Sequence, residues 1–252
     1  MKKQRIDILI VEQGLAESRN KAQRLVMAGE VLVNGQMVHK ASELFSPDCE
    51  VTITNKPRYV SRGGYKLEKA INSFTLGDLN GLVCADIGAS TGGFTDCLLQ
   101  NGVKKVYAID VGYGQLHQSL RDNPRVIEME RNNIKAIAEL PDEIDLVVID
   151  VSFISLKRVL PVIMGWNKTK AMRLVALVKP QFEVGKKIAA AGKGVIRKEE
   201  DRIKVLKEIT KFSIDSGFKL IDETVSPIKG PKGNIEYLMY LKYNPIKVED
   251  IE

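Results

Sequence analysis

The order of hydrophobic and polar positions divides the chain into two segments with different secondary-structure patterns. In the first, short apolar runs alternate with turn-forming residues, and Asn34-Gly35 between two such runs predicts a tight hairpin turn. Ser18 is a suitable N-cap for a helix, because its hydroxyl can accept a hydrogen bond from a free amide of the first turn. The predicted elements are a helix over 19–28 and strands over 31–33, 36–38 and 50–54. They form a small α+β unit that we expect to span residues 1–54.

A short basic stretch with a proline, residues 55–60, is the predicted linker to a second segment, residues 61–252. There, hydrophobic strands alternate with amphipathic helices, which is typical of an α/β fold with a doubly wound, mostly parallel sheet. The predicted strands cover 83–87, 105–109, 125–130, 146–151 and 174–179, and the predicted helices lie near 67–74, 92–101, 114–121, 155–166 and 198–216. Two consecutive strands, 219–225 and 237–243, predict an antiparallel hairpin that completes the sheet.

Composition changes this picture only slightly. Hydrophobic residues make up 44% of the chain, and 38 basic against 32 acidic residues give a net charge of +6. This mild excess fits a nucleic-acid partner but does not require one. The three cysteines form no CxxC pair and have no histidine cluster nearby, so neither disulfides nor a metal site are predicted. Because no apolar run approaches the ~18–20 residues of a membrane span, we expect a cytoplasmic protein without membrane contact.

A glycine-rich segment follows the first predicted strand of the second unit. Asp86 precedes Gly88, Ser90 and Gly92, and this spacing matches neither the GxGxxG dinucleotide pattern nor a phosphate-binding loop. An acidic residue before the first glycine suits a cationic ligand better than a pyrophosphate. Asp110 ends the next strand, where a carboxylate commonly accepts hydrogen bonds from ribose hydroxyls. Together these residues predict a nucleoside cofactor, and a tight turn beside a solvated aspartate is the alternative.

Four further polar residues fall where the active sites of open α/β folds gather. Asp150 and Lys179 end two very apolar strands. Lys66 lies on the helix before the first strand, and Glu236 opens the last one. Taken singly, a lysine at a strand end is usually a solvated charge. Two lysines and two carboxylates beside one crevice instead predict a catalytic site.

Several spaced motifs follow one another along the chain. In the second unit they are Ser-Arg-Gly-Gly-Tyr-Lys-Leu-Glu (61–68), Asp-Ile-Gly-Ala-Ser-Thr-Gly-Gly-Phe (86–94), Asp-Val-Ser-Phe-Ile-Ser (150–155), Lys-Pro-Gln-Phe-Glu (179–183) and Gly233-Asn234-x-Glu236. In this order they resemble the TlyA family of FtsJ-like rRNA 2′-O-methyltransferases, whose members often carry the name haemolysin. In the first unit, Arg5-x-Asp7, Gly14, Ser18-Arg19-x-x-Ala22 and residues 29–35 resemble the RNA-binding domain of ribosomal protein S4, so the resemblance runs nearly end to end.

This resemblance implies a Rossmann-like methyltransferase domain that uses S-adenosylmethionine and methylates the ribose 2′-OH of cytidine in ribosomal RNA. Ribosomal RNA or whole ribosomal subunits are then the expected partners. The implied catalytic tetrad is Lys66, Asp150, Lys179 and Glu236. The implied cofactor contacts are Asp86, Gly88, Ser90, Gly92 and Asp110, with an adenine contact left open among residues 130–133. The predicted RNA contacts are Arg5, Arg19, Arg24, Lys186 and Lys187.

The chemistry expected of the tetrad follows from the reactants. A sulfonium already carries a good leaving group, so the difficulty lies in aligning and deprotonating a weakly acidic ribose hydroxyl. A lysine can act as the base or, when charged, can stabilise the developing alkoxide. We assign this direct role to Lys179, with the other three residues in support.

Alternative interpretations remain for one segment and for the chain as a whole. Residues 184–198 are rich in glycine and lysine, which fits a mobile lid, an RNA clamp or a solvated loop. The competing function classes are a non-catalytic RNA-binding protein with a decayed enzyme domain and a pore-forming haemolysin. The presence of all four tetrad residue types argues against decay. A pore is disfavoured because no signal peptide, membrane span or strongly amphipathic membrane helix is visible.

Overall fold

The computed structural model describes residues 3–38, 40–54, 58–184 and 192–245. The chain forms two compact units, and the boundary between them along the sequence lies between Arg58 and Tyr59. Tyr59 is 2% exposed and packs edge-on against the ring of Tyr65. The second unit therefore begins two residues before the position expected from the sequence, because a buried aromatic side chain anchors this end of the linker.

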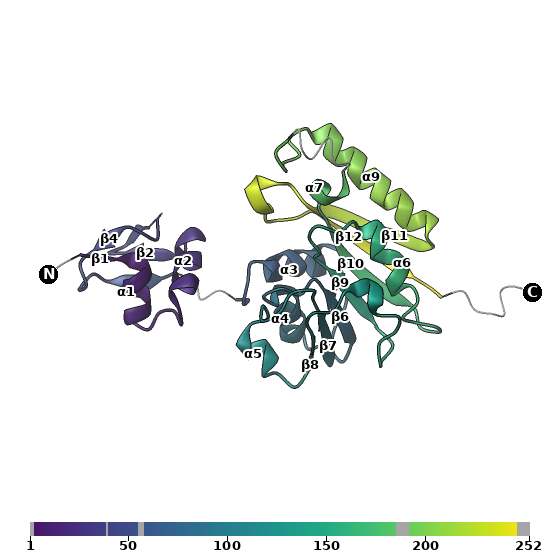
Figure 1. Ribbon diagram of the computed structural model, residues 1–252, viewed down its shortest axis with the longest axis horizontal. Helices are drawn as coiled ribbons and strands as arrows, with labels where there is room; N and C mark the ends of the chain where they lie inside the picture. The colour runs from purple at the N-terminus through teal and green to yellow at the C-terminus, as the bar shows by residue number, and fades with distance from the viewer. Residues whose placement is uncertain (1–2, 39, 55–57, 185–191, 246–252) are drawn as a thin grey trace, which may run out of the picture. The chain divides into compact units, whose positions relative to one another are not determined.

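The N-terminal unit is a small α+β fold in which two helices pack over short strands (Figure 1). Its elements are β1 (Gln4–Arg5), α1 (Ile6–Glu12), α2 (Arg19–Met27), β2 (Val31–Val33), β3 (Gln36–Met37), β4 (Leu44–Phe45) and β5 (Val51–Ile53). Two local predictions are confirmed. The Ser18 hydroxyl accepts from the Lys21 amide at 3.3 Å and so caps α2. Asn34 and Gly35 adopt φ angles of 48° and 79°, which close the β2–β3 hairpin as a primed turn.

A seven-stranded sheet forms the centre of the C-terminal unit, in the order β11-β12-β10-β9-β6-β7-β8. The strands are β6 (Val83–Ile87), β7 (Lys105–Ile109), β8 (Val126–Met129), β9 (Leu146–Ile149), β10 (Met172–Val178), β11 (Phe218–Val225) and β12 (Tyr237–Tyr243). The first five run parallel, whereas β12 pairs antiparallel with both β10 and β11. The predicted sheet and its closing hairpin are confirmed, with the last strand inserted between its partners.

Helices cover both faces of this sheet (Figure 1). One hydrophobic cluster joins it to α3 (Gly63–Ser73), α4 (Gly93–Gln100) and α5 (Gln118–Arg121). The other joins it to η1 (Ile134–Ala136), η2 (Leu156–Arg158), α6 (Leu160–Ile163) and α9 (Glu199–Asp215). The short elements α7 (Pro180–Glu183) and η3 (Pro231–Gly233) lie in the connections that follow β10 and β11.

Two predicted helices are shorter than the sequence suggested. The stretch 155–166 breaks into η2 and α6, with Pro161 in the first turn of α6, where a proline does not disrupt hydrogen bonding. The stretch 114–121 is helical only in α5, because the Glu130 carboxylate accepts from the amides of Gly114, Gln115 and Leu116 and holds them in a loop.

Candidate active site

The strand register brings the ends of four strands to one edge of the sheet. Ile149 of β9 pairs with Ile87 of β6 and with Ala176 of β10, so Asp150 emerges between the glycine loop and the end of β10. Val178 of β10 pairs with Tyr237 of β12, which places Lys179 and Glu236 one position beyond the same pair. The order of strands reverses between β6 and β9, and such a switch point is where open α/β sheets form their ligand crevice.

Close backbone contact brings α3 and its Lys66 to this edge. The first turns of α3 and α4 meet at glycines, and a Cβ on Gly93 would lie 2.8 Å from the Gly64 amide nitrogen. Any larger residue at Gly93 would push the two helices apart. The backbone of the glycine loop likewise touches the end of β9, since a Cβ on Gly88 would lie 2.6 Å from the Asp150 carbonyl oxygen.

These contacts bring the four predicted tetrad residues together in one chain of ion pairs. The Lys66 ammonium lies 2.7 Å from a Glu236 carboxylate oxygen and 3.9 Å from Asp150. The Lys179 ammonium lies 2.5 Å from the other oxygen of Asp150. The side chains of Lys66, Lys179 and Glu236 are buried, and that of Asp150 is one-fifth exposed. Two lysines and two carboxylates thus alternate in charge, with Asp150 at the most accessible point.

Two residues that the sequence analysis did not assign touch this tetrad. The Ser152 hydroxyl accepts a hydrogen bond from Lys179 at 3.0 Å. The Gln181 amide donates to Glu236 at 3.1 Å from a buried position on α7. Both lie inside motifs that the sequence analysis quoted, so their presence there was the available signal. Their side-chain directions could not be inferred from the sequence.

The end of β6, just before the glycine loop, carries a carboxylate that suits a cationic ligand. Asp86 is fully buried, and one of its oxygens accepts from the Thr95 hydroxyl at 2.7 Å. Its other oxygen has no hydrogen-bond partner among the described residues. Burial, helped by the nearby charge of Asp150, raises the pKa of Asp86 to about 7. An unpaired buried carboxylate oxygen fits a cationic group, such as the ammonium or sulfonium of S-adenosylmethionine.

Asp110 shapes the neighbouring wall of the crevice. Its two carboxylate oxygens accept from the Ser90 amide at 2.8 Å and from the Gly112 amide at 2.7 Å. Ser90 itself has a φ of 50°, so this hydrogen bond holds a left-handed turn in place. Carboxylate oxygens have further lone pairs, so Asp110 can accept from ribose hydroxyls while it holds the loop.

Residues 130–133, which follow β8, differ in how far their side chains are already bonded to other parts of the protein. Hydrogen bonds from three loop amides and an ion pair with Arg121 at 2.7 Å hold the pKa of Glu130 at about 2. The Arg131 guanidinium stacks on the exposed ring of Tyr113 at 3.9 Å. Asn133 caps η1. Glu130 therefore organises the loop over residues 114–116, and the choice of an adenine contact stays open.

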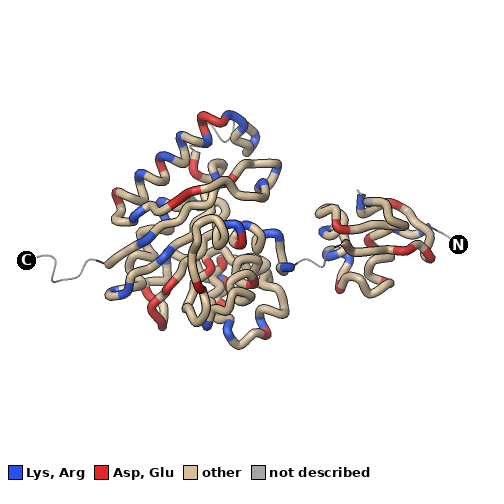
Figure 2. The backbone as a smooth tube through the Cα atoms, turned by 180° about the vertical axis from the view of Figure 1, so that it is seen from behind, with Lys and Arg blue, Asp and Glu red and all other residues tan. Residues whose placement is uncertain are grey.

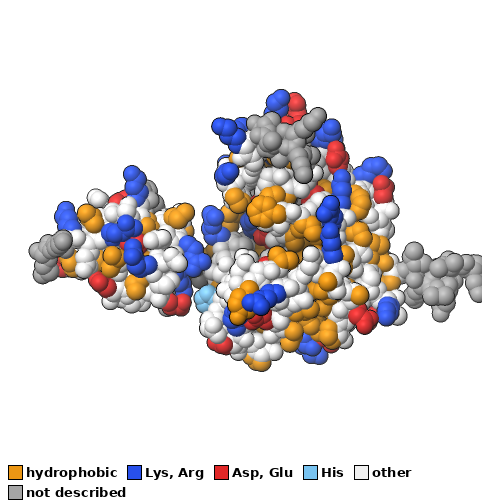
Figure 3. All heavy atoms as spheres, viewed as in Figure 1, with side chains coloured by type: hydrophobic (Ala, Val, Ile, Leu, Met, Phe, Trp, Pro, Cys, Tyr) orange, Lys and Arg blue, Asp and Glu red, His pale blue; other side chains and the backbone are white. Residues whose placement is uncertain are grey.

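An exposed aromatic ring lies beside the tetrad. Phe153 is 90% exposed and has a φ of 64°, a strained conformation for a bulky side chain. Its ring lies 4.9 Å from that of Phe182. The Glu183 carboxylate links α7 to the segment after β9. It accepts hydrogen bonds from the Ser155 hydroxyl at 2.5 Å and from the Leu156 amide at 2.8 Å. In Figure 3, hydrophobic side chains (orange) form patches on the visible face of the C-terminal unit.

Arg5 and Arg19, two predicted RNA contacts of the N-terminal unit, also form hydrogen bonds with a buried carboxylate. Asp7 is fully buried and accepts two hydrogen bonds from Arg5, one from Arg19 and one from Gln23. These partners hold the pKa of Asp7 well below its usual range. The side chains of Arg5 and Arg19 remain about half exposed. Arg24 on α2 is exposed as well.

The predicted lid or clamp is described only over its second half. Asn234 accepts from the Ile196 amide and donates to the Gly194 carbonyl, so residues 194–196 are tied to the β11–β12 connection. Lys186 and Lys187 lie outside the described residues.

Comparison with known proteins places this arrangement in a family. Residues 59–243 match the model of the FtsJ-like methyltransferase, and residues 4–51 match the S4 domain. The chain belongs to the FtsJ-like methyltransferase family. It is 41% identical to the 16S/23S rRNA (cytidine-2′-O)-methyltransferase TlyA of Mycobacterium tuberculosis, over 94% of this chain and 89% of that protein. It is 44% identical to Hemolysin A of Brachyspira hyodysenteriae, over 94% and 98%.

A solved structure agrees with these matches. A Streptococcus thermophilus protein that carries the provisional name hemolysin superimposes with a TM-score of 0.75 at 43% identity, covering 99% of this chain and 92% of that one. The predicted family, the methyltransferase fold with its N-terminal S4 domain, and S-adenosylmethionine as the methyl donor are confirmed. The role of each tetrad and cofactor residue stays a prediction.

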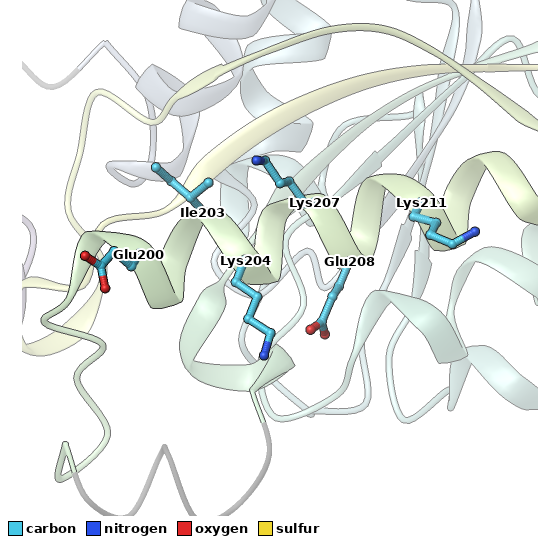
Figure 4. Close-up of a pocket in the computed structure, with 6 residues that line it drawn as sticks. All are labelled: Glu200, Ile203, Lys204, Lys207, Glu208 and Lys211. Carbon is cyan, nitrogen blue, oxygen red and sulfur yellow. The ribbon is translucent and has the colours of Figure 1, made fainter.

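Other features of this family member do not add to the site. A shallow hollow along α9 is lined by Glu200, Ile203, Lys204, Lys207, Glu208 and Lys211 (Figure 4). Charges of both signs occur along this helix (Figure 2), and none of the predicted site residues lines the hollow. Over the described residues, no group of three or more His, Cys, Asp or Glu side chains could hold a metal ion. No helix in that part of the chain is long and apolar enough to cross a membrane.

Proposed function

We propose that this chain methylates the ribose 2′-OH of a cytidine in ribosomal RNA. The observation that supports it most directly is the alternating chain of two lysines and two carboxylates at the sheet edge, next to the glycine loop. The similarity to a protein named for cytidine 2′-O-methylation of 16S and 23S rRNA supports the substrate. Ribosomal RNA or a ribosomal subunit is then the partner in the cytoplasm, and the proposed chemistry uses neither a metal ion nor a membrane.

The proposed roles follow from the contacts of each side chain. The bound cofactor supplies an electrophilic methyl group. Lys179 acts on the ribose hydroxyl: as a neutral amine it takes the proton, and as an ammonium it stabilises the negative charge on the oxygen. Asp150 holds Lys179 in position and is the most exposed of the four, which suits a contact with the hydroxyl. Lys66 and Glu236 form the buried pair that fixes Asp150 from the other side.

Phe153 is the proposed platform for a base of the RNA. A strained, exposed aromatic side chain three residues from Asp150 costs free energy in the absence of a ligand. Stacking of a base on such a ring stabilises a complex by about 1–3 kcal/mol and accepts an unpaired nucleotide. This placement supports single-stranded or extruded RNA as the form that reaches the tetrad.

The proposed cofactor contact of Asp110 predicts a measurable loss of affinity. Asp110→Ala should weaken S-adenosylmethionine binding by about 1.5–3 kcal/mol, since hydrogen bonds to a charged group are lost and the Ser90 turn is released. Calorimetry on the folded variant measures the change. Asp215→Ala, at the exposed end of α9, is the matched control and should bind normally. Unchanged affinity of Asp110→Ala would remove this residue from the cofactor site.

The proposed RNA contacts of the N-terminal unit predict a change in salt dependence. Replacing Arg19 and Arg24 by alanine should weaken binding to rRNA while cofactor affinity stays the same. The logarithmic salt slope should become shallower by roughly 0.7–0.9 for each lost phosphate contact. Arg24→Ala alone separates the charge effect from the contact between Arg19 and Asp7, and Lys211→Ala on α9 is the control. Equal slopes for variant and wild type would mean that this surface does not bind the RNA backbone.

Transfer of a labelled methyl group tests the proposed function as a whole. The full chain is incubated with tritiated S-adenosylmethionine and with unmodified 30S subunits, 50S subunits or naked rRNA. We expect label in RNA that resists alkaline cleavage at the modified position, because a 2′-O-methyl group blocks attack on the adjacent phosphate. Label in a base, in protein or in none of the three substrates would contradict the proposal.

A further inference from the structure

We infer that Gln181 is a positioning residue of the active site, which fixes the Glu236 carboxylate so that the tetrad keeps its geometry. This inference rests on the proposed function. It concerns a residue on α7, two positions after Lys179, that is only 8% exposed and whose amide nitrogen points at Glu236 rather than at solvent.

Glu236 is enclosed by contacts from three directions. Its Oε2 accepts from Lys66 on α3 at 2.7 Å, and its Oε1 accepts from the Gln181 amide at 3.1 Å. The backbone of Gly230, in the β11–β12 connection, packs closely against the carboxyl group, since a Cβ there would lie 2.6 Å from its carboxyl carbon. The side chain is 0% exposed. The hydrogen bond from Gln181 therefore sets the rotation of the Glu236 carboxylate and leaves its Oε2 directed at Lys66.

The other end of the Gln181 amide shows that this residue is not the best choice for stability alone. Its carbonyl oxygen is buried and has no hydrogen-bond partner among the described residues. A buried acceptor without a partner destabilises the folded state, and an apolar side chain of similar size would avoid that penalty. The hydrogen bond from the amide nitrogen to Glu236 explains why a glutamine with an unpartnered oxygen stands at this position. Glu236 in turn contacts Lys66, and Lys66 contacts Asp150.

Separate measurements of stability and activity test the inference. In Gln181→Met the side chain keeps its length but cannot donate. We expect a kcat about 10- to 100-fold lower, because a hydrogen bond to a buried charge is lost. The melting temperature should change little, because removal of the unpartnered carbonyl oxygen offsets the loss of that hydrogen bond. Affinities for S-adenosylmethionine and rRNA should stay within about twofold. Gln118→Met, which breaks an exposed amide–carboxylate hydrogen bond on α5, is the matched control and should retain wild-type kcat.

A second variant gives a readout that a purely structural role would not change. Gln181→Glu places a carboxyl against Glu236, and two carboxyls in contact repel when both are ionised but share a proton at lower pH. Its kcat relative to wild type should rise as the pH falls from about 8 to about 6, because the protonated carboxyl donates as the amide did. The ratio for Gln181→Met should stay flat.

The outcomes separate this inference from the proposed function. If the wild type methylates rRNA and Gln181→Met turns over normally, Gln181 has no positioning role, although the function stands. If Gln181→Met loses activity in parallel with stability, and Gln181→Glu shows no recovery at lower pH, the residue is structural. If the wild type transfers no methyl group to RNA, the proposed function is refuted, and the role of Gln181, which rests on it, is refuted with it.

Discussion

Lys179→Ala should lower methyl transfer by about 10³-fold or more while S-adenosylmethionine and rRNA affinities stay nearly unchanged. The ammonium lies 2.5 Å from Asp150 and 3.0 Å from the Ser152 hydroxyl at the sheet edge, where the proposed reaction takes place. An interaction that acts mainly in the transition state changes kcat and leaves binding intact. Single-turnover kinetics with saturating cofactor and RNA measure the chemical step without interference from product release.

Lys179→Arg should lose methyl-transfer activity almost as completely as Lys179→Ala. A guanidinium does not give up its proton at neutral pH, and its planar fork does not fit a space built for one nitrogen between Asp150 and Ser152. Lys204→Ala, at an exposed position on α9, is the control for a general loss of positive charge. Near-normal turnover of Lys179→Ala would refute the proposed role of the tetrad and leave a cofactor-binding fold without an assigned base.

Asp150→Asn should reduce turnover about as strongly, because the amide keeps the shape of the side chain but removes the charge that both lysines contact. Lys66 would retain its ion pair with Glu236, whereas Lys179 would retain only the Ser152 hydroxyl among its described polar partners. We expect cofactor binding to stay within a few-fold of wild type, since Asp150 faces the glycine loop through its backbone carbonyl.

The double variant tests whether the two residues work as one unit. If Asp150 acts by holding Lys179, Asp150→Asn combined with Lys179→Ala should cost little more than either change alone. Activity losses that multiply would show that Asp150 and Lys179 act independently, which would contradict the proposed arrangement. Thermal unfolding of all three variants checks that the comparison concerns folded protein.

Tertiary packing also overrides local preference in the N-terminal unit. The sequence analysis assigned no element to residues 6–12, where β-branched residues are frequent. The segment is helix α1, because Ile6, Leu9 and Ile10 share one face and are buried in the unit's core. The same turn of helix buries Asp7, which explains why two arginines predicted to face RNA also contact an internal carboxylate.

The sequence by itself determined the features that depend on near neighbours in the chain. The Ser18 cap, the Asn34-Gly35 turn and the alternation of strands with helices each follow from the chemistry of a few consecutive residues, and each is confirmed. The spacing of the glycine loop and of the polar residues at strand ends likewise indicated where a site would form. These signals are local, so they can be read without knowing which strands pair.

Only the tertiary structure decided which of those residues meet. Lys66 and Glu236 are 170 positions apart, and their 2.7 Å contact depends on β12 inserting beside β10 and on α3 approaching α4 at Gly93. The direction of the Gln181 side chain and the exposure of Phe153 depend on the same packing. Contacts of this kind are set by strand register and by the close fit of distant segments, and the physical information that fixes them is not contained in any short stretch of sequence.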